Sequence, residues 1–154
     1  MKRAQVISGF MMFSVALGYS QGAHAVLGGR ADTIAADRTS LQAVHRSTTS
    51  HKGYTVEEIV SDATTVREFV SPSGVVFGIA WNGYVNPDLT QLLGAYWGEY
   101  SAARKKAVRI YGTNRQKLST SSIVVEKWGH MRNLQGRAYV PSLIPSGVDI
   151  GEIK

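Results

Sequence analysis

The clearest pattern in the chain lies between residues 64 and 100, where two apolar runs of strand length precede an apolar face at helical spacing. Residues 64–70 and 74–81 are rich in β-branched and aromatic side chains, which is typical of strands. The intervening sequence SPSG, residues 71–74, places Pro second and Gly fourth in a turn. The pattern therefore predicts an antiparallel hairpin. Gly78 predicts either a bulge or a close approach of another element.

A helix is predicted directly after this hairpin. Asn86 is expected to be its N-cap, followed by Pro87 and by Asp88 at the positive end of the helix dipole. The apolar residues then recur at i, i+3, i+4, i+7, i+8 and i+11: Leu89, Leu92, Leu93, Tyr96, Trp97 and Tyr100. Such a continuous face indicates one amphipathic helix that docks on the sheet. Gly94 and Gly98 within it are expected to allow close approach to a strand, or else a groove beside Trp97.

Further strands are predicted on both sides of this region. Residues 54–60 extend the hairpin into a three-strand meander, and residues 122–128 and 134–140 form a second hairpin. The polar stretches 47–50 and 113–119 are interpreted as a linker and a loop. The predicted fold class is α+β, an antiparallel sheet of about five strands (meander, helix, hairpin) with one amphipathic helix packed on a face.

The N-terminus has the three parts of a secretory signal peptide. Lys2 and Arg3 are basic, residues 6–17 are mostly apolar, and Ala23-His24-Ala25 is a cleavage site of the A-x-A kind. Cleavage after Ala25 predicts a single exported domain, residues 26–154, in the periplasm or secreted, with no transmembrane segment left. The chain has no Cys, which excludes disulfides, thiol catalysis and a lipid anchor at the cleavage site.

The charge of the chain is basic, with 17 Lys and Arg against 11 Asp and Glu. Loss of Lys2 and Arg3 leaves 15 basic residues against 11 acidic ones, or +4. A basic patch is predicted where six cations gather without an acidic residue among them: Arg104, Lys105, Lys106, Arg109, Arg115 and Lys117. Either it contacts anionic envelope polymers or lipid headgroups, or it is a solvated helix end. Nucleic acid is not an expected partner of an exported protein.

Candidate chemistry is sparse. No two His residues of residues 26–154 have metal-ligand spacing and no G-x-S-x-G is present, so neither a metal nor a cofactor is predicted. Glu68 and His130 are the candidates for acid and base groups. A ligand-binding platform is predicted more readily, because aromatic side chains near loops suit sugars or peptides. Its candidate residues are Asn82, Tyr84, Asn86, Trp97 and Trp128.

Three segments carry a family resemblance: Leu27-Gly28-Gly29, the run REFVSPSGVVFGIAWNG with NPDLTQLLGAYW, and GHMRNLQGRAYVPSLIP near the end. Together they resemble the exported bacterial family DUF2844, a domain of unknown function. The resemblance implies an exported envelope protein and brings no activity, cofactor or catalytic residue with it.

The functional hypothesis is a small exported binding or accessory protein without catalysis, whose partner is an envelope polymer or an envelope protein. One alternative is a hydrolase that acts on an envelope polymer. Another is a structural subunit that assembles through an exposed strand edge.

Overall fold

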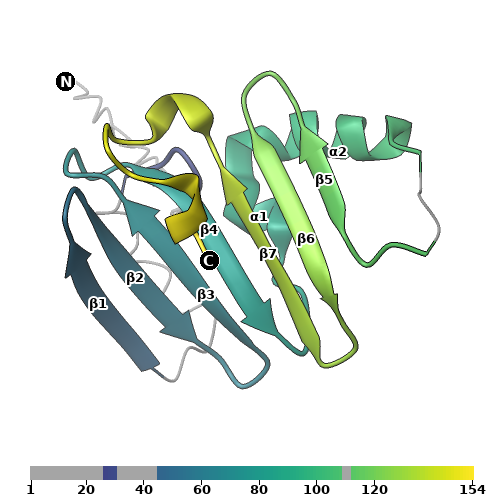
Figure 1. Ribbon diagram of the computed structural model, residues 1–154, viewed down its shortest axis with the longest axis horizontal. Helices are drawn as coiled ribbons and strands as arrows, with labels where there is room; N and C mark the ends of the chain where they lie inside the picture. The colour runs from purple at the N-terminus through teal and green to yellow at the C-terminus, as the bar shows by residue number, and fades with distance from the viewer. Residues whose placement is uncertain (1–25, 31–44, 109–111) are drawn as a thin grey trace, which may run out of the picture.

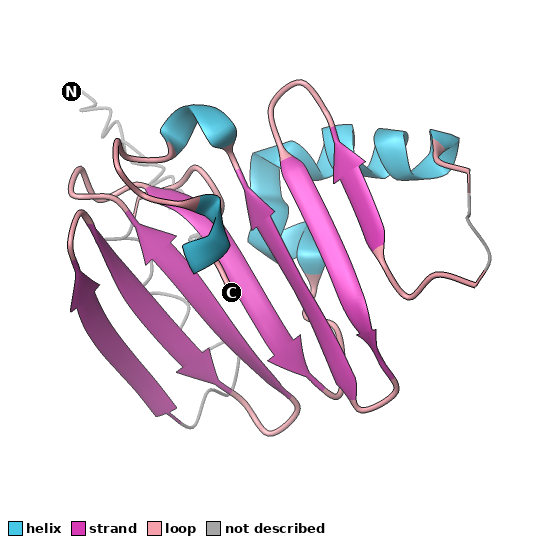
Figure 2. Cartoon of the chain, in the orientation of Figure 1, coloured by secondary structure: helices cyan, strands magenta, loops and turns pink. Residues whose placement is uncertain are grey.

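The computed structural model describes residues 26–30, 45–108 and 112–154, which form one antiparallel sheet with α-helices on one face and short 3-10 turns on the other (Figures 1 and 2). The predicted signal peptide, residues 31–44 and residues 109–111 lie outside the described residues. The strands are β1 (His45–His51), β2 (Tyr54–Val60), β3 (Thr64–Val70), β4 (Val76–Gly83), β5 (Gln116–Ser119), β6 (Val124–His130) and β7 (Asn133–Tyr139). The helices are α1 (Leu89–Leu93), α2 (Trp97–Lys106) and the 3-10 turns η2 (Gly94–Tyr96), η3 (Pro141–Leu143) and η4 (Ile150–Glu152).

The α+β class is confirmed, but the sheet has seven strands where about five were predicted. Its order is β1-β2-β3-β4-β7-β6-β5, so the meander and the second hairpin join through β4 and β7. The two additional strands, β1 and β5, are the edges, and they fall in the stretches interpreted as linker and loop. Edge strands are held by backbone pairing to a single neighbour, so polar sequences such as HRSTTSH form them without an apolar pattern.

The first hairpin forms as predicted. The Gly74 N–H donates to the Ser71 carbonyl at 2.9 Å, and Gly74 has a φ of 78°. The pairing of β3 with β4 shifts register between Phe69 and Val70, opposite Gly78. A Cβ at Gly78 would lie 3.0 Å from the Ile153 Cδ1 atom. Both explanations for this glycine therefore hold: a bulge lies beside it, and the C-terminal segment approaches it.

The predicted single helix is two helices. The N-cap is Asp88, whose carboxylate accepts from the Thr90 N–H at 2.9 Å, and the prediction of Asn86 was wrong. Gly94 interrupts the helix with φ 46° and ψ −115°, and a Cβ there would overlap Val26. The close approach at Gly94 is therefore to the N-terminal segment. At Gly98 an added Cβ would meet no other element within 4 Å among the described residues.

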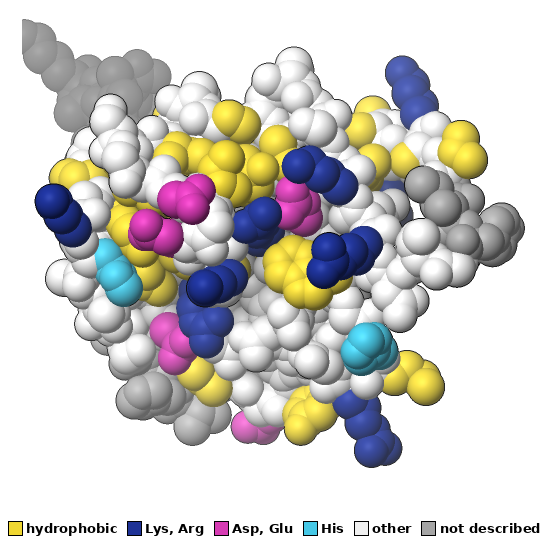
Figure 3. Space-filling model, viewed as in Figure 1, with side chains coloured by type: hydrophobic (Ala, Val, Ile, Leu, Met, Phe, Trp, Pro, Cys, Tyr) yellow, Lys and Arg dark blue, Asp and Glu magenta, His cyan; other side chains and the backbone are white. Residues whose placement is uncertain are grey.

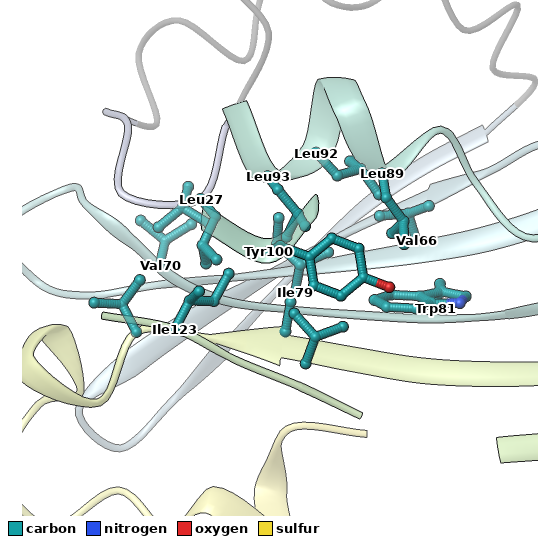
Figure 4. Packing of buried hydrophobic residues seen from close by; sticks show 14 residues of the cluster. Leu27, Val66, Val70, Ile79, Trp81, Leu89, Leu92, Leu93, Tyr100 and Ile123 are labelled. Atoms are coloured by element: carbon teal, nitrogen blue, oxygen red, sulfur yellow. The ribbon is translucent and has the colours of Figure 1, made fainter. Parts of the chain in front are cut away.

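The sheet is covered on both faces, which gives two apolar clusters. We call the face under α1 and α2 the rear face and the opposite one the front face. On the rear, Leu89, Leu92 and Leu93 point from α1 to the sheet, and Tyr100 of α2 lies beside Trp81 (Figure 4). On the front, η3, η4 and their connecting loop cross the sheet as the C-terminal segment, residues 141–154 (Figure 1). Its Ile153 is buried among Tyr54, Phe69, Phe77, Ala80, Val124 and Tyr139.

Candidate functional site

A row of charged side chains crosses the front face. Side chains alternate between the faces of a sheet, and directly paired residues share a face. The register therefore places one residue from each of six neighbouring strands in a single line: Glu58, Arg67, Ala80, Arg137, Glu126 and Lys117. Ala80, in the middle, is the only one of the six without a charge.

The charged side chains in this row form ion pairs in two groups. Arg67 Nε lies 2.7 Å from Glu58 Oε2 on one side of Ala80. On the other side Glu126 is held by two cations, with Arg137 Nη2 at 2.7 Å and Lys117 Nζ at 3.0 Å. Arg137 and Glu126 are largely buried, whereas the Lys117 side chain is 64% exposed. Lys117 is therefore the solvent-facing member of this group.

The C-terminal segment lies across the row where Ala80 leaves room. Arg137 Nη1 donates to the Ile150 carbonyl at 2.9 Å and to the Ile153 carbonyl at 3.3 Å. Arg67 Nη1 donates to the Lys154 carbonyl at 3.3 Å. The two arginines thus use one side of the guanidinium for a carboxylate and the other for backbone carbonyls. They position the end of the chain against the sheet.

A cleft of about 490 Å³ opens between the end of the chain and β5. We call it the front cleft; its lining includes Arg115, Lys117, Glu126, Trp128, Arg137 and Lys154. Figure 3 shows this face of the molecule, with dark blue Lys and Arg side chains gathered around yellow apolar ones. The size is in the range of small-molecule sites, and cations outnumber carboxylates among the lining side chains.

Hydrogen bonds fix the orientation of the Trp128 ring. Its Nε1 donates to Gln135 Oε1 at 2.9 Å, and Gln135 Nε2 in turn donates to Asn133 Oδ1 at 2.9 Å. The Arg137 guanidinium lies 6.0 Å from the centre of the Trp128 ring. Gln135 of β7 pairs with Trp128 of β6 on one side and with Asn82 of β4 on the other. The three residues therefore form a second row on the front face.

The pKa values of Glu126 and Lys117 are both shifted in the cleft. Burial raises the pKa of Glu126, but hydrogen bonds and charges from Lys117 and Arg137 outweigh it and leave that pKa below its ordinary value. The hydrogen bond to Glu126 raises the pKa of Lys117. At neutral pH Glu126 is therefore a carboxylate balanced by two cations, and it has no proton to give as a general acid.

Of the five predicted ligand-binding residues, the structure brings Trp128 together with Asn82 on the front face and with Asn86 in the lining of a second cavity. Asn82 and Trp128 share the front face, and Trp128 lines the front cleft. Tyr84 is 63% exposed in the loop after β4. Asn86 accepts a hydrogen bond from the indole of buried Trp81 at 3.3 Å, and Trp97 packs against the rear cluster.

Glu68 and His130 are not brought together. Glu68 faces the rear, 2% exposed, and is paired across the sheet with Glu57 of β2. His130 faces the front at the end of β6 and is exposed, with Nδ1 3.5 Å from Asn114 Nδ2. The sheet therefore separates the two groups.

The six residues of the predicted basic patch are divided between elements. The last turn of α2 contains Arg104, Lys105 and Lys106. Arg115 lies directly before β5 and Lys117 lies within it, while Arg109 is outside the described residues. The second cavity, of about 660 Å³, is lined by Arg104, Arg115 and Lys117 among others. Three of the six cations therefore meet at the β5 edge.

Sequence reasoning missed Arg137 and Lys154 as members of the cleft. Arg137 had a local signal, because it alternates with Gln135 and Tyr139 on one face of a predicted strand. Lys154 had none, because its place depends on how the C-terminal segment folds back. Within the described residues no group of three His, Asp or Glu side chains could hold a metal ion, and no helix there is long and apolar enough to span a membrane.

The chain belongs to the family described as protein of unknown function (DUF2844), whose model matches residues 23–153. The resemblance seen in the sequence is thereby confirmed. No curated protein and no solved structure matches the chain.

Proposed function

We propose that this member of the DUF2844 family is an exported binding protein that holds an anionic envelope polymer in the front cleft, without catalysis. The observation that carries the proposal is the cleft itself, in which a half-buried Trp128 lies among Arg115, Lys117, Arg137 and Lys154. Cations that line a concave site with low-dielectric walls concentrate the electric field there, which attracts anionic ligands.

Export is supported by the basic and apolar N-terminus and by the Ala23-His24-Ala25 motif. An exported protein meets the polymers and proteins of the envelope before any other ligand, and many envelope polymers are anionic. A binding role is further supported by the pairing of Glu126, because a carboxylate held by two cations does not transfer protons near neutral pH. The positions of Glu68 and His130 on opposite faces of the sheet also favour the binding role over the hydrolase alternative.

The test is co-sedimentation with isolated cell-wall and outer-membrane fractions at low and high salt, using protein purified after expression of the full chain. The double substitution Arg115→Gln and Lys117→Gln removes two cleft cations. The matched control, Lys105→Gln with Lys106→Gln, removes two exposed cations from α2. We expect the cleft variant to lose about tenfold in affinity, equivalent to about 1.4 kcal/mol, and the control to lose less than twofold.

Equal retention of both variants would contradict the proposal, because the cleft would then contribute nothing. Absence of retention in every fraction would contradict it as well.

A further inference from the structure

The front cleft combines an oriented aromatic ring with solvent-facing cations. The hydrogen bond from Nε1 to Gln135 Oε1 holds the Trp128 ring in one orientation, and the side chain lines the cleft. Rigid aromatic walls with a few placed polar groups are typical of sites for flat or ring-shaped ligands. The ligand should therefore present an apolar ring surface as well as a negative charge.

The cations of the cleft fall into two kinds. Arg137 is fully engaged with Glu126 and with the carbonyls of Ile150 and Ile153, so it serves the structure. Lys117 touches Glu126 from the solvent side. Arg115 and Lys154 are exposed and form no ion pair among the residues that the structure describes. An incoming anion would therefore meet Lys117, Arg115 and Lys154 without breaking the Arg137 contacts.

Neutral polar side chains continue from the cleft along the sheet. The register places Thr65 of β3, Asn82 of β4 and Gln135 of β7 in one row with Trp128 of β6. Adjacent strands lie about 4.8 Å apart, so the row extends over about 14 Å. Hydroxyl and amide groups at this spacing suit the hydroxyls of an oligosaccharide that lies across the strands.

A lipid surface fits this cleft less well. Docking to a bilayer requires exposed apolar side chains around the headgroup site. Among the described residues, the most exposed large apolar ones outside the α2 end are Tyr84, Val85 and Met131, which lie in the loops after β4 and β6. None of the three lines the front cleft.

We infer that the front cleft binds an acidic saccharide, with a sugar ring against Trp128 and its carboxylate at Lys117 and Arg115. This inference rests on the proposed function and specifies its ligand class. The roles it assigns are separable: Trp128 recognises the ring whatever its charge, whereas Lys117 recognises the acid. A neutral sugar should therefore depend on Trp128 and not on Lys117.

The experiment is calorimetric titration of the purified protein with trigalacturonic acid, with a neutral hexose trisaccharide, and with vesicles of phosphatidylglycerol and phosphatidylethanolamine. We expect the acidic trisaccharide to bind at least tenfold more tightly than the neutral one. Lys117→Gln should reduce acid binding about tenfold and leave neutral binding unchanged, while Trp128→Leu should weaken both. Lys105→Gln is the matched control, and circular dichroism checks that each variant is folded.

Equal affinity for the acidic and neutral sugars would overturn the inference. Lys117-dependent binding to vesicles without binding to the acidic sugar would also overturn it, although the protein would still be one that binds an anionic envelope component. If the protein neither binds the sugar nor sediments with any envelope fraction, both the inference and the proposed function fail.

Discussion

Removal of the Ile153 side chain should detach the C-terminal segment from the sheet. Ile153 is 0% exposed and packs on Gly78, where the absence of a side chain leaves space for it. Leu143, Ile144 and Val148 of the segment pack against the same cluster but are only partly buried. The contacts from Arg67, Arg137 and Tyr54 are hydrogen bonds at its exposed or half-buried rim. Ile153 is therefore expected to be the main anchor.

The magnitude follows from the atoms removed. Ile153→Ala deletes three carbon groups from a fully buried position, which at about 0.8 kcal/mol each corresponds to about 2.5 kcal/mol of transfer free energy. The cavity left behind adds to this, and measured substitutions of this kind cost about 2–5 kcal/mol. We expect a loss of about 3 kcal/mol. Domains of this size are stable by about 5–15 kcal/mol, so the variant should still fold.

The measurement is urea unfolding of the wild type, Ile153→Ala and the control Ile150→Ala, followed by tryptophan fluorescence. Ile150 lies in the same segment but is 36% exposed, so its truncation should cost less than about 1 kcal/mol. Gly151 and Lys154 form one wall of the front cleft, so Ile153→Ala should also weaken ligand binding. A loss below 1 kcal/mol, or equal losses in both variants, would refute the anchoring role of Ile153.

Three further outcomes are expected. Burial and the hydrogen bond to Glu152 raise the pKa of Tyr54 from 10.0 to about 12. The contribution of the neutral Tyr54 hydroxyl to the free energy of unfolding is therefore complete below pH 10 and is lost as the pH rises towards 12. Urea unfolding of Tyr54→Phe across that range should show its deficit relative to wild type shrinking, and a constant deficit would be inconsistent with this linkage. Hydrogen bonds from Thr120, Ser121 and Ser122 lower the pKa of Glu99 from 4.5 to about 2. The contribution of the Glu99 carboxylate to stability is therefore present above pH 4.5 and is lost as the pH falls to 2. Glu99→Gln should accordingly be less acid-sensitive than wild type in thermal melts, and an unchanged acid profile would count against this role. The Tyr100 hydroxyl is buried without a hydrogen-bond partner among the described residues. Tyr100→Phe should therefore leave the free energy of unfolding unchanged or raise it by up to about 1 kcal/mol. A loss of more than about 1 kcal/mol in urea unfolding would show that the hydroxyl has a partner.

The strongest local signals predicted local structure well. Turn chemistry and strand propensity act over a few residues, so short stretches of sequence were enough to predict several elements. These are the SPSG turn, the strands β2, β3, β6 and β7, and the cations at the end of α2. The helix was predicted in place but not in detail. Asp88 competes with Asn86 as a cap, and the contact of Gly94 with Val26 breaks the helix from outside it.

The sequence by itself determined the α+β class, the position of the helices, the basic and apolar N-terminus, and the candidacy of Trp128 and Lys117. Only the tertiary structure decided which residues form the front cleft. Arg137 lies between Ala80 and Glu126 because β7 pairs with β4, a contact between residues more than fifty positions apart in the chain. Such pairings and the return of the C-terminal segment depend on burial of apolar area contributed by several elements at once, and no local pattern encodes that sum.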